Sequence, residues 1–136
     1  MNLWLETARR LLAKAKDDRY ILAGLMHDSS APVSPLGFHA PQAVEKALKA
    51  VLAARAVEYP MTNNIAMLLT KLTDQGISAP PDAAELPTRT PFEVAFRHDD
   101  AGEPEDIRLD RTRALACVDR TVAWAESHMT AAEDSR

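Results

Sequence analysis

The stretch that most constrains the fold runs from Phe38 to Leu52 and carries apolar residues at helical spacing. At about 100° per residue these apolar residues share one face of a helix. That face consists of Ala40, Ala43, Val44, Ala47, Leu48 and Val51. Its alanines let a neighbouring helix approach closely. We therefore predict an amphipathic helix that packs its apolar face against other helices, with Leu48 buried between them.

The opposite face of this helix is polar and carries an imidazole. It consists of His39, Gln42, Glu45, Lys46 and Lys49. Phe38 falls on the polar side of a straight helix, and Pro41 lacks an N–H and disfavours helical geometry at the residue before it. The helix therefore either begins near Pro41 or is kinked there. Both cases leave the directions of Phe38 and His39 open.

Three other segments have helical periodicity. The first covers about residues 2–28, the next begins at Thr62, Asn63 or Asn64 and ends at Gly76, and the last covers about residues 108–129. The amphipathic helix that contains residues 38–52 continues to about Ala56. Short helical turns are expected at 82–86 and 91–96. Amphipathic helices must bury their apolar stripes on one another. We predict an all-α, up-and-down four-helix bundle with a short additional helix over residues 1–130, and a frayed tail at 131–136.

Composition limits the classes of function. The formal net charge is −4, which is not typical of a strong electrostatic nucleic-acid binder. The single cysteine, Cys117, cannot form an intramolecular disulfide. With no long apolar segment and no apolar leader, the sequence predicts a cytoplasmic protein without a membrane span. His98, Asp99 and Asp100 have no second ligand cluster, so neither a metal nor a cofactor is predicted.

Residues 38–50 read FHAPQAVEKALKA, which resembles the signature helix of the HEPN domain family, usually written FHAQQAAEKALKA. Only Pro41 and Val44 depart from it. The helix after Trp4 and the segment beginning at Pro60 resemble the family's first and third helices, so the resemblance extends to about Met129. It implies a four-helix bundle with a short fifth helix, commonly a homodimer. Phe38 and Leu52 lie outside the main apolar arc, where a second copy would cover them.

The family's ribonucleases use an Arg and a His separated by four to six residues. None of His27, His39, His98 and His128 has an Arg at that distance on its N-terminal side. Arg120 and His128 have seven residues between them and are predicted to form a surface pair instead. The departure from the family pattern argues against ribonuclease activity.

The candidate ligand-binding residues would contact a nucleotide or another phosphate. They are His39, Gln42, Lys46, Lys49, Arg97 and His98. Ammonium and guanidinium groups suit phosphate oxygens, and both lysines are expected to be exposed. The structural alternatives are a partly buried His39 bonded to a neighbouring helix and a Glu45–Lys49 pair one turn apart. For Arg97, the alternative is a pair with Asp99, Asp100 or a helix C-terminus.

Three functions fit these patterns. The first is a non-catalytic module that binds a nucleotide or a partner protein, such as the minimal nucleotidyltransferases that the resemblance suggests. The second is a metal-independent ribonuclease of toxin–antitoxin type with a degenerate active site, acting on RNA. The third is a dimerisation scaffold without a ligand. Fold alone does not choose between them.

Overall fold

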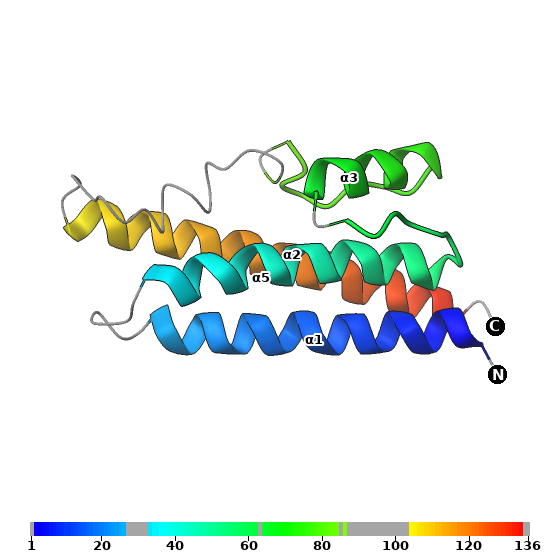
Figure 1. Cartoon of the computed structure of the whole chain (residues 1–136), viewed down its shortest axis with the longest axis horizontal. Coiled ribbons are helices and arrows are strands. Elements are labelled where there is room, and N and C mark those ends of the chain that lie inside the picture. Colours follow the sequence, from blue (N-terminus) through cyan, green and yellow to red (C-terminus); the bar gives the residue numbers. More distant parts are fainter. Residues whose placement is uncertain (1, 27–32, 63, 85, 87–103, 135–136) are drawn as a thin grey trace.

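A computed structural model describes residues 2–26, 33–62, 64–84, 86 and 104–134. Its helices are α1 (Leu3–Met26), α2 (Val33–Ala54), α3 (Ile65–Asp74) and α5 (Pro104–Asp134). The long helices α1, α2 and α5 lie side by side, with α1 antiparallel to the other two, and α3 lies along the outer side of α2 (Figure 1). The predicted all-α bundle is confirmed. No helix in these ranges is both long and apolar enough to cross a membrane.

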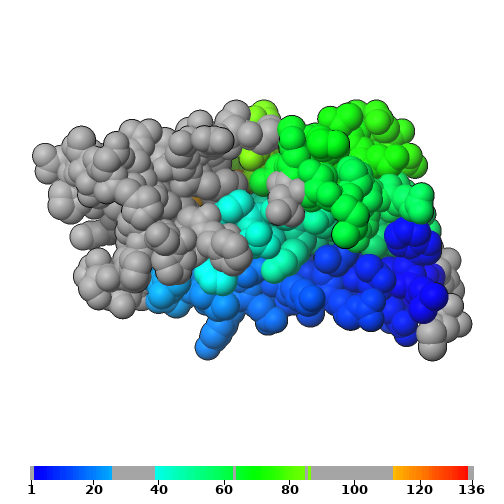
Figure 2. Space-filling model, viewed as in Figure 1, coloured from blue at the N-terminus to red at the C-terminus, as the bar shows by residue number. Residues whose placement is uncertain are grey.

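Helix α2 is the centre of the core because it packs against α1, α3 and α5. Every residue of its predicted apolar face is buried, and Leu48 is fully enclosed. In the space-filling view the coloured part of α2 appears as a narrow band between α1 and α3 (Figure 2). Leu52, expected to need a second copy to cover it, is fully buried within its own chain. That expectation was wrong because α2 is covered on more than one side.

Helix α2 does not begin near Pro41, which was one of the two expected alternatives. It begins at Val33, so Pro41 lies inside the helix rather than at its start. Proline in a helix interior removes one backbone hydrogen bond. The burial of Ala40, Ala43 and Val44 around it offsets this cost. The side chain of Phe38 lies outside the described residues.

The end of α2 is closed by a residue with left-handed backbone geometry. The Val57 N–H donates to the Leu52 carbonyl over 2.9 Å, and the Ala56 N–H donates to the Ala53 carbonyl over 2.9 Å. These two bonds form a Schellman motif, which usually places glycine where Ala56 stands. Ala56 has φ 55°, a conformation that a Cβ atom disfavours. The helix therefore ends at Ala54, two residues before the predicted end.

Replacing Ala56 with glycine should raise the free energy of unfolding by about 1 kcal/mol, because glycine adopts positive φ without steric cost. Urea denaturation followed by circular dichroism measures the change. Ala13→Gly is the matched control, since Ala13 is an exposed residue inside α1. That change should lower stability by about 1 kcal/mol. A destabilising Ala56→Gly would contradict the assigned backbone geometry.

Helix α3 begins and ends as its sequence predicts. The Asn64 side-chain oxygen accepts a hydrogen bond from the Met67 N–H, which makes Asn64 the N-cap among the three candidates. Gly76 follows the last turn with φ 70°, and the Ile77 N–H donates to the Leu72 carbonyl over 3.0 Å. Leu68 and Leu72 face the core and are fully buried.

The final helix is longer than predicted at both ends. It begins at Pro104, whose missing N–H costs nothing at the first helical position, and it continues to Asp134. Ala132 is buried and Glu133 lies 3.6 Å from Arg9 of α1, so residues 131–134 extend the helix rather than fray. Before α5, the Leu86 N–H donates to the Asp82 carbonyl, which forms the expected turn at 82–86. The turn expected at 91–96 lies outside the described residues.

Candidate ligand-binding site

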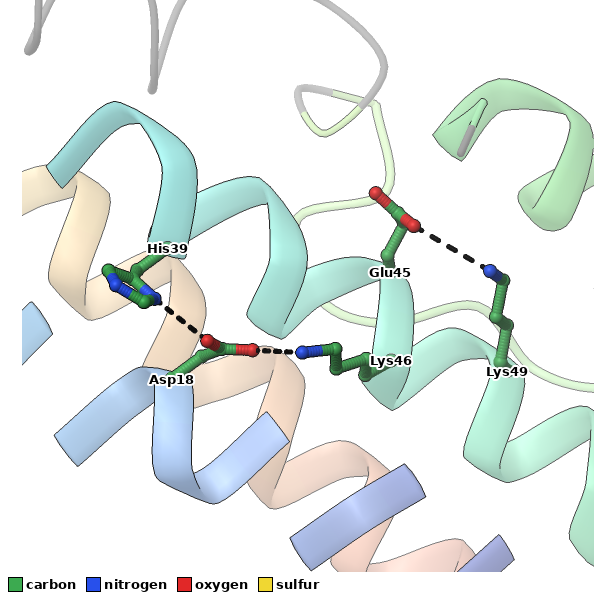
Figure 3. A network of polar contacts seen from close by, with 5 residues as sticks. All are labelled: Asp18, His39, Glu45, Lys46 and Lys49. Carbon is green, nitrogen blue, oxygen red and sulfur yellow. Dashed lines mark hydrogen bonds and ion pairs between the residues drawn. The ribbon is translucent and has the colours of Figure 1, made fainter. Parts of the chain in front are cut away.

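A buried carboxylate on α1 organises the polar face of α2. Asp18 is only 6% exposed and accepts two side-chain contacts from α2. Its Oδ1 lies 2.8 Å from His39 Nδ1, and its Oδ2 lies 2.7 Å from Lys46 Nζ (Figure 3). His39 and Lys46 stand two helical turns apart, so both side chains reach the same neighbour on α1. An ionised carboxylate only accepts hydrogen bonds, so the His39 proton in this contact resides on Nδ1.

A second charged pair lies on the same helix. Glu45 is buried, and its Oε1 lies 3.6 Å from Lys49 Nζ, one turn away. The two side chains lie apart from Asp18 on another side of α2 (Figure 3). Burial raises the pKa of the Glu45 carboxyl, while the positive charges of Lys49 and Lys46 oppose that shift. The predicted Glu45–Lys49 pair is therefore present, with Glu45 buried and Lys49 partly exposed.

The raised pKa of Glu45 predicts a pH-dependent contribution to stability. The folded chain holds this proton more tightly than the unfolded chain, so the contribution is present below the ordinary Glu value and declines as pH rises through the folded-state pKa. Glu45→Gln removes this decline. We expect the unfolding free energy of the variant, relative to the native chain, to increase from pH 4 to pH 7 in urea denaturation series. The exposed Glu58→Gln change serves as control, and a flat difference for Glu45→Gln would contradict the raised pKa.

The lysines on the polar face of α2 are less exposed to solvent than predicted. The side chains of Lys46 and Lys49 are 27% and 17% exposed, so the expectation that both lysines are exposed was wrong. The reason is that α2 has neighbours on several sides, and its polar residues must pair with carboxylates where they meet those neighbours. His39 keeps 21% of its side chain exposed, so it is partly buried and bonded to α1, as the structural alternative held.

The six candidate residues divide into two groups. His39, Gln42, Lys46 and Lys49 all lie on α2, and Gln42 is half-buried beside the others. Arg97 and His98 lie outside the described residues. The arrangement holds an imidazole and an ammonium group at fixed positions around one carboxylate. In the described part of the chain, no group of three metal-ligating side chains gathers.

Asp18 is the residue that sequence reasoning missed. A signal for it exists: it lies three residues after Ala15 and four before Leu22, both buried residues of α1. A charged residue at that register faces the core and requires a partner on the neighbouring helix. The partner itself depends on how α1 and α2 are rotated against each other.

The predicted surface pair of Arg120 and His128 is also wrong. Arg120 donates two hydrogen bonds to Asp82, over 2.9 and 3.2 Å. His128 instead contacts Trp124, Ser78 and Arg55. Arg120 finds its partner outside α5, whereas His128 contacts Trp124 within α5 and two residues outside it.

A family model described as HEPN domain matches residues 1–128 of the chain. No curated protein and no solved structure matches it at a significant level. The match includes the helix that carries His39 and Lys46 and the helix that carries Asp18.

Proposed function

Because the chain belongs to the HEPN domain family, we propose that it is a cytoplasmic, non-catalytic module that binds a nucleotide or a partner protein such as a minimal nucleotidyltransferase. Membership supports a helical module related to nucleotides or RNA. The observation that carries the ligand-binding part is the pair of contacts from His39 and Lys46 to the buried Asp18.

The cluster of Asp18, His39 and Lys46 is better suited to positioning side chains than to stabilising the fold. Burying an ion pair has a desolvation cost that its attraction offsets only in part, so such a pair is weak evidence for stability. A clamped carboxylate does fix the imidazole and ammonium groups that contact it. Both groups retain partial access to solvent, at 21% and 27% of their side chains. We propose that a nucleotide phosphate approaches the α2 face from there, with Gln42 next to it and Lys49 farther along the same helix.

The test is a titration of labelled AMP and of a short RNA at two salt concentrations. Lys46→Ala and Lys49→Ala should each weaken binding by roughly 3- to 10-fold, and added salt should weaken it further, because partly exposed charges are screened. Removing the Glu45 charge should strengthen binding slightly. Lys14→Ala is the control, since Lys14 is exposed on α1. Unchanged affinity in both lysine variants would exclude this face.

A separate observation favours a partner protein. Met61 is 98% exposed and Met67 is 48% exposed, and Met67 lines an open groove of about 410 Å³ on α3. The groove is lined by Pro60, Ala66, Met67, Thr70, Lys71 and Asp74. Exposed methionines adapt to the shape of a partner and are common on such surfaces. We propose this groove as the place where a partner protein docks.

Binding to a purified minimal nucleotidyltransferase tests that proposal. Met67→Lys should weaken the complex at least tenfold, because it places a charge in an apolar contact. Leu3→Lys changes an exposed apolar residue on α1 and should leave affinity unchanged. Equal affinity of the native chain and Met67→Lys would remove the groove from the interface.

We also propose that the chain forms a homodimer, as the family resemblance implies. Leu52 is buried within its own chain, so it no longer supports a dimer. The exposed Tyr20 and Ile21 on α1 supply apolar surface that a second copy would cover. Light scattering that finds a monomer at high micromolar concentration would exclude the dimer.

A further inference from the structure

Three segments meet at His128, away from the Asp18 cluster. His128 and Trp124 lie on α5, Arg55 follows the last residue of α2, and Ser78 lies in the segment after α3. Arg55 Nη2 is 3.5 Å from His128 Nδ1, and Ser78 Oγ is 3.4 Å from His128 Nε2. Since a guanidinium only donates, His128 Nδ1 must accept from it, and the ring proton lies on Nε2 toward Ser78.

The backbone holds these side chains in place. The Arg55 N–H donates to the Val51 and Leu52 carbonyls at the end of α2. The Trp124 indole donates to the Ser78 carbonyl over 3.1 Å, and its ring meets the His128 ring at a centroid distance of 5.0 Å. Trp124 therefore anchors both the serine and the histidine. The three polar side chains therefore meet at His128.

Among the described residues, no acid balances the charge of this cluster. Within the described residues no carboxylate lies within 4.0 Å of Arg55, whereas Arg120, Lys46 and Lys49 each have one. Burial lowers the pKa of His128, and the Arg55 charge lowers it further. An oxyanion would accept from Arg55 and Ser78 and would stabilise the protonated form of His128, which then becomes a third donor.

We propose that Arg55, Ser78 and His128 form a binding site for a phosphate group, separate from the α2 face. The group is inorganic phosphate or the phosphate of a nucleoside monophosphate, two sources with the same chemistry. Binding takes up a proton on His128, because a nearby negative charge favours the imidazolium. Affinity therefore rises as pH falls.

Isothermal titration with inorganic phosphate, AMP and sulfate at pH 5.5 and 7.5, at constant ionic strength, tests the site. Sulfate keeps its charge over this pH range, so any change in its affinity with pH reports protonation of the protein. We expect at least tenfold tighter sulfate binding at pH 5.5, loss of that pH dependence in His128→Gln, and at least tenfold weaker binding in Arg55→Gln. Arg113→Gln, on an exposed part of α5, should leave this binding unchanged.

Circular dichroism verifies that each variant is folded. Tighter binding of AMP than of inorganic phosphate identifies the nucleotide as the source, and equal affinity identifies the free anion. Native-level sulfate affinity in folded Arg55→Gln would overturn the proposal, as would a native affinity that does not change between the two pH values. Lys46→Ala should keep the pH dependence of sulfate binding that His128→Gln loses, so failure of one site is distinguishable from failure of the other.

Discussion

Leu48→Ala should lower the free energy of unfolding by about 2–5 kcal/mol, the range found when a buried leucine is truncated and its cavity collapses only in part. Leu48 is fully buried in α2, the helix that contacts α1, α3 and α5. Its neighbours on the same face, Val44 and Val51, are buried too. A cavity at this position is enclosed by rigid helices, so the loss should fall in the upper part of that range.

Urea denaturation monitored by circular dichroism measures this loss, with the slope of the transition compared between variants. Leu3→Ala is the matched control, because Leu3 lies at the start of α1 and is largely exposed. The same truncation there should cost less than about 0.5 kcal/mol. A loss below about 0.5 kcal/mol for Leu48→Ala would show that the helical phase assigned to α2 is wrong.

The sequence predicted the core of α2 correctly because helical periodicity depends only on residue spacing. Ala40, Ala43, Val44, Leu48 and Val51 recur on one face, and all five are buried. The same reasoning failed for Leu52, which lies off that face. A helix covered on several sides buries residues outside its apolar arc, and spacing within one helix does not reveal how many neighbours it has.

The candidate site was predicted less completely than the core. His39 and Lys46 were recognised as facing the same way, but their shared partner on α1 was not. A contact between helices depends on their relative rotation, and no local pattern encodes it. Pro41 added a second difficulty, because a proline that ends a helix and one that lies within a helix have the same sequence signature.

Helix ends followed local chemistry where a cap was present. Asn64 and Gly76 delimit α3 as expected, since a side-chain acceptor and a residue free to adopt positive φ act within one turn. The end of α5 was misjudged because tertiary contacts extend it. Glu133 meets Arg9, and Ala132 is buried, and neither contact is visible from α5 alone.

Asp18→Asn should lower the free energy of unfolding by about 2 kcal/mol. The amide has one acceptor in place of two, so it cannot accept from both His39 and Lys46, and its NH₂ group meets a donor instead. Loss of a hydrogen bond to a charged group costs about 1.5–3 kcal/mol. The full cost of breaking a buried ion pair, about 3–5 kcal/mol, is not expected, because His39 and Lys46 can still reach water.

Two further variants identify the origin of that loss. Asp17→Asn changes the neighbouring exposed residue and should cost less than about 0.5 kcal/mol. Adding Lys46→Met to Asp18→Asn removes the unpaired ammonium group, so the double variant should regain part of the lost stability. Together with the Lys46→Met single variant, urea denaturation of the native chain, Asp18→Asn and the double variant gives the coupling energy. Additive losses would mean that Asp18 and Lys46 do not stabilise each other, and a native-like Asp18→Asn would show that the carboxylate does not join α1 to α2.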